Sequence, residues 1–175
     1  MSRQHLRFPH EKRVHRHQLK VRISDLNYGQ HLGHDALVSL LHQARVSWWA
    51  AHGLAEWDIG GVGTVIADLA VEYRAEAFWD DCLTIELAVG EVGRKGAEIW
   101  HRIVKSHPEG EQEIAIARIG MVFFDFQARQ AVAVPDVFHQ VIKAPLRLST
   151  EGLSSSESVA SAENRLSSQG DVDVT

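Results

Sequence analysis

Residues 34–53 read HDALVSLLHQARVSWWAAHG, and this stretch decides the fold. It predicts one long helix, because its apolar side chains recur at helical spacing. They are Leu37, Leu40, Leu41, Ala44, Trp48 and Ala51. Asp35 suits the first turn of such a helix and Gly53 its C-terminal cap. A helix of about 20 residues is about 30 Å long, so its apolar face needs a broad surface to pack on.

The segments around this helix predict that surface, because they alternate as β-strands do. Before the helix, residues 13–24 place His17, Leu19, Val21 and Ile23 on one face. After it, we expect strands at 64–74, 82–92, 97–105 and 112–126, the last apolar enough to be buried on both faces, and a short helix within 135–145. The order predicts an α+β domain in which an antiparallel sheet wraps around one long helix.

Composition indicates a single globular domain. The chain has 175 residues, of which 45% are hydrophobic and 23% charged. Its single cysteine, Cys82, excludes an intrachain disulfide and any multi-cysteine metal site, and it suits a reducing compartment. No apolar run approaches the roughly 18 residues of a membrane span, and the N-terminus lacks the apolar core of a secretory signal. We therefore expect a cytoplasmic protein with no membrane partner.

The two ends differ from the middle in charge and composition. Residues 1–20 carry six Lys and Arg against one Glu, and we expect 1–12 to be a solvated basic arm. Residues 149–175 hold eight serines and no aromatic residue, so we expect 147–175 to be a disordered, Ser-rich acidic tail. The ordered domain is then expected at 13–146. Its middle has no run of Lys or Arg, so nucleic-acid binding is not expected.

The candidate chemistry lies in the loop before the helix, DLNYGQHLG at 25–33. Asp25 and His31 share this loop, and together a carboxylate and an imidazole can activate water or attack a carbonyl carbon. Alternatively, Asp25 caps the turn and His31 packs at the helix entrance, and spacing alone does not decide between these readings. Asn27 can donate its amide to an anionic oxygen or can simply form an Asx-turn.

Further candidates lie outside this loop. His34 and Asp35 open the helix, where backbone N–H groups can stabilise an oxyanion. Asp68 is a candidate acid, or an ion-pair partner of Arg74 on the less apolar face of its strand. Arg94 and Lys95 form a charged turn that either binds phosphate or is simply solvated. His15, His17 and His101 have no ligand spacing that predicts a metal, so we expect strand histidines and no metal site.

Four stretches resemble the acyl-CoA thioesterases of the 4-hydroxybenzoyl-CoA thioesterase class, which have the hot-dog fold. They are VRISDLNYGQHLGHDAL at 21–37, QARVSWWAAHGL at 43–54, GGVGTVIADLAVEYRAEAFWDDCLTIE at 60–86 and GRKGAEIWHRI at 93–103. In that class a strand, an Asp-containing loop, a Gly-His pair and a long helix come in this order. A Tyr-Arg pair and an aromatic-Asp turn follow, as Tyr73-Arg74 and Trp79-Asp80-Asp81 do here. The resemblance runs from about Leu19 to Val134.

This resemblance implies hydrolysis of an acyl-CoA or acyl-carrier-protein thioester, without a cofactor, in a homodimer or homotetramer. It implies Asp25 as the base, Asn27 or His31 as the group that positions water, and Asp68 as an acid from the opposite subunit. Arg94 and Lys95 would hold the CoA phosphates. The class often has a second loop carboxylate two residues after the first. Here that position is Asn27, which cannot act as a general base or as a carboxylate nucleophile.

Two alternatives remain open at this level. Asp25-Leu26-Asn27 followed by His31 also resembles the Asp-x-Asn…His signature of hot-dog enoyl-CoA hydratases, with one additional residue before the histidine. The missing second carboxylate also fits a non-catalytic domain that binds an acyl thioester. Turnover of an enoyl-CoA, release of thiol, or binding without turnover would distinguish the three.

Overall fold

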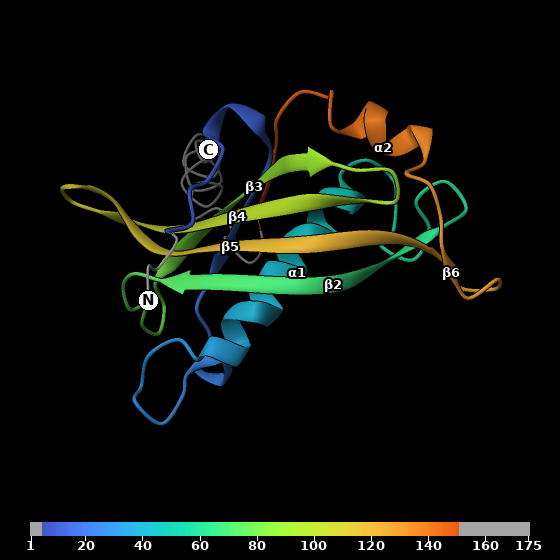
Figure 1. Cartoon of the computed structure of the whole chain (residues 1–175). Helices are drawn as coiled ribbons and strands as arrows, with labels where there is room; N and C mark the ends of the chain where they lie inside the picture. The colour runs from blue at the N-terminus through green and yellow to red at the C-terminus, as the bar shows by residue number, and fades with distance from the viewer. Residues whose placement is uncertain (1–4, 151–175) are drawn as a thin grey trace, which may run out of the picture.

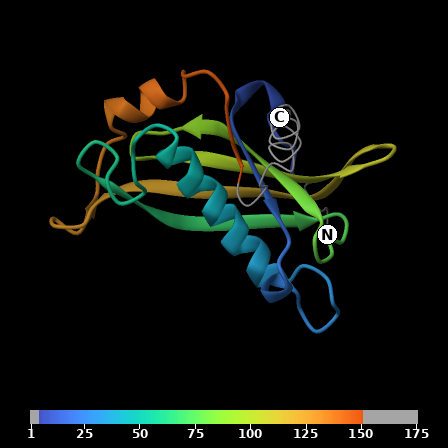
Figure 2. The same cartoon turned by 180° about the vertical axis from the view of Figure 1, so that it is seen from behind.

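A computed structural model describes residues 5–150 (Figure 1). Its elements are β1 (Arg13–Lys20), α1 (His34–Ala50), β2 (Gly63–Tyr73), β3 (Cys82–Val92), β4 (Gly96–His107), β5 (Gly110–Asp125), β6 (Gln130–Ala131), α2 (Asp136–Val141) and β7 (Arg147–Thr150), with short 3-10 helices η1 (His10–Lys12) and η2 (Ile23–Asp25). Within these residues the sheet has the order β2-β5-β4-β3-β1-β7, with β6 paired to β5. Figure 2 shows α1 lying across one face of this sheet. The predicted hot-dog arrangement is confirmed.

The core lies between α1 and the sheet. The helix buries Leu37, Leu40, Leu41, Ala44 and Trp48, as its spacing predicted, together with Trp49, whereas Ala51 caps the helix and is only partly buried. Trp48 and Trp49 stack with ring centroids 4.4 Å apart, and both contact Phe138 of α2, so α2 closes one end of the core. Burying a large apolar side chain contributes about 1.5–3 kcal/mol, so this aromatic group fixes α1 firmly against the sheet.

Strand β2 departs from the regular alternation expected for 64–74. Its pairing with β5 joins Ile66 to Met121 and then Asp68 to Gly120, so Ala67 is an extra, bulged residue. The bulge reverses which side chains face α1 in the first part of the strand. Ile66 therefore lies on the helix side with Leu69, although strict alternation from Leu69 would put Val65 there. The sequence pattern could not show this, because a bulge depends on the partner strand.

Both ends of the expected domain are longer than predicted. The side chain of Phe8 is buried against Ala88 and Ile116 on the outer face of the sheet, which is the face turned away from α1, so the expected arm is anchored at Phe8 although Arg7 and Lys12 are exposed. Residues 147–150, expected to begin the disordered tail, form β7. This strand pairs with β1 in parallel, so the sheet is not wholly antiparallel. Residues 1–4 and the rest of the predicted tail, 151–175, lie outside the described residues.

In residues 5–150, no helix has the length and apolar character that crossing a membrane requires.

Candidate active site

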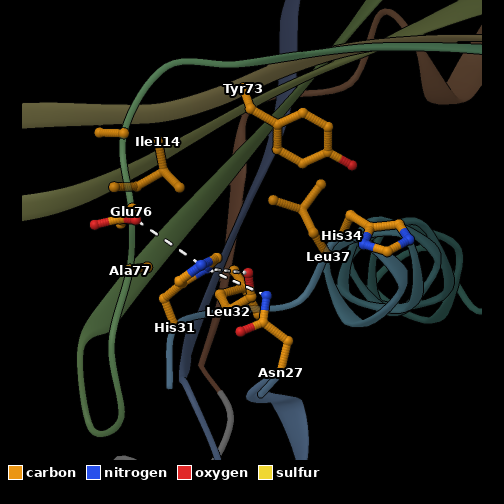
Figure 3. Close-up of a pocket in the computed structure, with 10 residues that line it drawn as sticks. Asn27, His31, Leu32, His34, Leu37, Tyr73, Glu76, Ala77 and Ile114 are labelled. Atoms are coloured by element: carbon orange, nitrogen blue, oxygen red, sulfur yellow. Dashed lines mark hydrogen bonds and ion pairs between the residues drawn. The ribbon is translucent and has the colours of Figure 1, made fainter. Parts of the chain in front are cut away.

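A cavity of about 220 Å³ opens where the loop before α1 meets the segment that follows β2. Figure 3 shows His31 between Asn27 and Glu76, with Tyr73 and His34 on the side nearer the helix. The cavity is lined by Asn27, His31, Leu32, His34, Leu37, Tyr73, Ala75, Glu76, Ala77 and Ile114. The candidate site thus combines the first turn of α1 with the ends of β2 and β5.

Backbone hydrogen bonds give the loop its shape. The N–H of Asn27 donates to the carbonyl of His31 (3.0 Å), and the N–H of Gly33 donates to the carbonyl of Asp25 (2.9 Å). The N–H of Leu32 donates to the carbonyl of Ala77 (2.8 Å), which ties the loop to the segment after β2. These bonds turn the side chains of Asn27 and His31 towards the same cavity.

His31 has the hydrogen bonds of a positioned base. Its Nδ1 lies 3.3 Å from the carbonyl oxygen of Leu32, so the tautomer that carries the proton on Nδ1 satisfies this acceptor. Nδ2 of Asn27 lies 3.5 Å from Nδ1 and makes no hydrogen bond to it in this tautomer, because both nitrogens carry protons. In this tautomer Nε2 keeps its lone pair, and it lies 3.8 Å from Oε1 of Glu76. Nε2 can accept a proton, and Glu76 can stabilise the imidazolium that results.

Asn27 keeps its amide group available. Its Oδ1 accepts a hydrogen bond from the N–H of Gly29 (2.8 Å), which is the Asx-turn expected for this residue type. The amide nitrogen remains beside the cavity, where it can donate to a carbonyl oxygen. A Cβ on Gly29 would lie 3.0 Å from Nε2 of His31 and 3.1 Å from Oδ1 of Asn27. Glycine at this position therefore lets the two polar side chains come together.

Tyr73 and Glu76 were not among the residues predicted from the sequence. Tyr73 is the last residue of β2 and Glu76 follows it, and both reach the site only because Leu32 binds Ala77 across the two loops. Burial, and then the nearby charge of Asp35, raises the pKa of Tyr73 above its usual value, so its hydroxyl is protonated and can donate. The one hint in the sequence was the Tyr-Arg pair of the resemblance, which marks the end of β2.

The first turn of α1 faces this cavity at His34. Gly33 is the N-cap residue, and no side chain caps the turn. The N–H groups of residues 34–36 therefore have no partner within the described part of the chain. They are oriented to stabilise negative charge, as predicted for the helix start. Asp35 does not line the cavity.

Asp25 is close to Asn27 and His31 in sequence, but its side chain lies in a different environment. Its Oδ2 accepts a hydrogen bond from the N–H of Arg22 (2.8 Å), in a reciprocal cap of η2. It is not among the residues that line the cavity. The structure thus places His31 and Asn27 together and leaves Asp25 as the cap of the preceding turn.

Asp68, Arg94 and Lys95 also lie away from this cavity. Oδ1 of Asp68 accepts a hydrogen bond from Nη2 of Arg118 (2.9 Å) on the outer face of the sheet, rather than pairing with Arg74. Arg94 and Lys95 form the turn between β3 and β4, at the opposite end of the sheet (Figure 1). Nζ of Lys95 donates to the carbonyl of Ala131 there (2.7 Å).

The strand histidines are buried. His15 and His17 contact the hydroxyl of Ser149 at 3.0 and 2.8 Å, and His101 lies beneath α1. Burial lowers the pKa of His15 to about 4 and that of His101 to about 3, so both are neutral near pH 7. In the described part of the chain no group of three or more His, Cys, Asp or Glu residues could hold a metal ion.

Comparisons with known proteins identify the family and agree with the fold. The sequence profile of the thioesterase-like superfamily matches residues 21–142. A 4-hydroxybenzoyl-CoA thioesterase mutant, complexed with 4-hydroxybenzoyl-CoA, is 24% identical with a TM-score of 0.67, and the match covers 75% of this chain and 99% of that chain. The 4-hydroxybenzoyl-CoA thioesterase from Pseudomonas sp. is 24% identical over 72% of this chain and 96% of that one, with a TM-score of 0.64. A probable thioesterase from Escherichia coli is 26% identical over 73% and 98%, with a TM-score of 0.60.

The chain belongs to the thioesterase-like superfamily, because the profile spans well over half of its length. It has the hot-dog fold of the 4-hydroxybenzoyl-CoA thioesterases described above. No curated protein matches the chain in sequence.

Proposed function

We propose that this protein hydrolyses an acyl-CoA thioester to a free acid and CoA at the cavity beside His31. The observation that carries the proposal is the pairing of His31 with Asn27 at the uncapped start of α1, in a chain of this family. The similar thioesterase that holds 4-hydroxybenzoyl-CoA supports CoA as the carrier. An acyl-carrier protein would present the same thioester group.

The reaction requires one water and one proton shuttle. Nε2 of His31 takes a proton from water, and the oxygen attacks the thioester carbonyl carbon. The amide of Asn27 and the first-turn N–H groups of α1 stabilise the negative oxygen. The C–S bond then breaks, and the imidazolium returns its proton to the departing thiolate. Glu76 stabilises the imidazolium in the meantime. Asp25 was the base implied by the resemblance, and its role as a cap gives that assignment less support.

The active protein is proposed to be at least a homodimer. Strand β2 is an edge of the sheet, and an unpaired edge invites a partner strand. Its helix-side residues Ile66 and Leu69 are each 42% exposed, which leaves apolar surface beside the edge. Pairing of β2 with its copy would cover this surface and place the acyl group between the subunits, along α1.

We also propose that the protein is located in the cytoplasm. Cys82 is a free, exposed thiol, which suits a reducing compartment.

The hypothesis of an enoyl-CoA hydratase has less support from the geometry than thioester hydrolysis does. It requires Asp25 and His31 to act on one water, whereas Asp25 does not line the cavity that His31 faces. The non-catalytic reading predicts binding of a CoA ester without turnover.

A panel of short, medium, long and aromatic acyl-CoAs tests the proposal. Thiol release is followed with a thiol-reactive dye, and loss of an enoyl-CoA double bond by its absorbance. We expect thiol release with at least one acyl-CoA. Consumption of the enoyl-CoA without thiol release, or saturable binding without either signal, would contradict hydrolysis.

A further inference from the structure

A second cavity, of about 360 Å³, lies between α1 and β2 beside the first one. Both lie between the same two elements, since Leu37 of α1 and Tyr73 of β2 line the first while Val38 of α1 and Leu69 of β2 line the second. Leu69 and Val38 give this second cavity apolar walls, and Arg45, Glu56 and His42 give it a charged end. The charged end is the unexpected feature, because an unsubstituted acyl chain offers it no partner.

Arg45 is buried and only partly satisfied. The residue is 5% exposed, and its Nε donates to Oε1 of Glu56 (2.5 Å). Within residues 5–150 this is its only hydrogen bond, so Nη1 and Nη2 have no acceptor. Neither atom is sealed from solvent, and Arg45 lines the cavity. A guanidinium with two free nitrogens in an apolar site presents strong donors to any oxygen that enters.

The carboxylate of Glu56 contacts His42 as well as Arg45. Its second oxygen, Oε2 of Glu56, lies 2.5 Å from Nε2 of His42. The backbone N–H of Thr64 donates to the carbonyl of Glu56 (3.1 Å), and this bond holds the backbone of Glu56 in place. One carboxylate therefore bonds two basic side chains, and within residues 5–150 it leaves Nη1 and Nη2 of Arg45 without an acceptor. His101 behind it is buried and neutral near pH 7, so it adds no charge to the cluster.

We propose that this second cavity binds the distal end of the acyl group, and that Arg45 selects acyl groups bearing an oxygen acceptor at that end. This inference rests on the proposed thioester hydrolysis and names its substrate class. His34, at the first cavity, and Arg45 are about 16 Å apart along the axis of α1, at about 1.5 Å per residue. A medium-length acyl chain with its thioester beside His31 can therefore extend to Arg45. The acceptor is either a hydroxyl or a carboxylate oxygen.

The test compares three medium-chain acyl-CoAs of equal length that end in a methyl, a hydroxyl or a carboxylate group. The wild-type protein is expected to favour one or both oxygen-bearing substrates in kcat/KM. The double variant Arg45→Leu/Glu56→Leu removes the ion pair together, because leaving one buried charge alone would destabilise the fold. We expect it to lose about tenfold or more of this preference, since a hydrogen bond to a charged donor contributes about 1.5–3 kcal/mol.

The matched control is Arg118→Leu/Glu98→Leu, which removes an ion pair of 2.9 Å on the outer face. It should keep the wild-type preference. Arg45→Lys is the second variant: it retains the charge but loses the planar fork, so it should fold and show a reduced preference. Circular dichroism and thermal melting confirm that each variant is folded.

Binding of the three free acids, measured by calorimetry, provides a readout that does not need turnover. If no acyl-CoA is hydrolysed, the proposed function fails, while tighter binding of an oxygen-bearing acid that weakens in the Arg45 variants still supports this site. The inference is overturned if the wild-type protein prefers the methyl-ended substrate and acid. Equal selectivity in the wild-type protein and in the Arg45→Leu/Glu56→Leu variant would also overturn it, because the ion pair would then serve only to join α1 to the connector before β2.

Discussion

The carboxylate of Asp25 and the imidazole of His31 take different partners although they share one loop. Asp25 binds the N–H of Arg22, three residues before it, and His31 faces the cavity with Asn27. Local capping is a common role for an aspartate in such a turn. The same loop thus contains one residue that holds its shape and two that can act on a substrate.

These different roles of Asp25 and His31 predict different effects of substitution on kcat and on stability. His31→Gln should lower kcat by about 10²–10⁴-fold, because it removes the proton shuttle. Asp25→Ala should lower the free energy of unfolding by about 1 kcal/mol and lower kcat less than tenfold, because it removes a cap. Steady-state thiol release and urea unfolding measure the two effects. A larger loss of kcat in the Asp25 variant than in the His31 variant would restore Asp25 as the base.

Replacing Gly29 by alanine tests whether the close approach of His31 and Asn27 matters for kcat. An alanine there would crowd Nε2 of His31 and Oδ1 of Asn27, so kcat should fall about tenfold with little change in melting temperature. The control is Gly93→Ala, where the new Cβ would meet only the carbonyl oxygen of Gly96 at 3.7 Å. Equal kcat values for the two variants would show that the spacing of His31 and Asn27 does not matter.

The site could be predicted from the sequence only where its residues are local. Asn27, His31 and His34 lie within one loop and one helix turn, and each was singled out. Glu76 and Tyr73 were not, because they reach the cavity through the contact of Leu32 with Ala77. No spacing in the sequence encodes that contact.

At the scale of single elements, β1 carries a charge-sensitive contact. His15 joins this strand to α1 through Ser47 (3.2 Å) and to β7 through Ser149 (3.0 Å). Burial, then the charges of His17 and His52, lowers the pKa of His15 to about 4. The buried ring is therefore neutral in the folded protein near pH 7.

The pKa of His15 predicts a loss of stability in acid. An unfolded histidine has a pKa of about 6.5, so below that pH the unfolded chain binds a proton that folded His15 does not take up until about pH 4. The free energy of unfolding should fall between these values, by about 1.4 kcal/mol per pH unit for this group. His101 adds to the same trend.

Urea unfolding across this pH range checks the prediction. His15→Gln should reduce the slope of stability against pH by about one proton. An unchanged slope would mean that His15 does not remain neutral in the folded protein.

Periodicity predicted the type and order of the main elements, but it did not predict how they pair. The helix expected within 34–53 appears as α1 and the strand expected at 82–92 appears as β3, since one residue pattern sets each. The bulge at Ala67, the parallel pairing of β7 and the burial of Phe8 all depend on segments far apart in the sequence. Such contacts leave little trace in a single strand's pattern.

Across the described residues, 5–150, the sheet of the molecule has two unequal edges, β2 and β7. Leu69 on β2 borders the second cavity, whereas Leu148 lies on β7 at the other edge. If subunits pair through β2, Leu69→Lys should convert the dimer to a monomer in light scattering, because it places a charge in the contact. Leu148→Lys should leave the dimer intact. A dimer that dissociates only with the Leu148 variant would move the interface to β7.

The placement of the thioester is the most direct test of the central claim. A crystal structure of the protein with a non-hydrolysable acyl-CoA analogue measures the distances from the carbonyl group to Nε2 of His31 and to Nδ2 of Asn27. We expect the carbonyl group beside both atoms and the first turn of α1, within hydrogen-bond reach or one water away. An analogue bound with its carbonyl group far from His31 would contradict the proposed role of His31 in thioester hydrolysis.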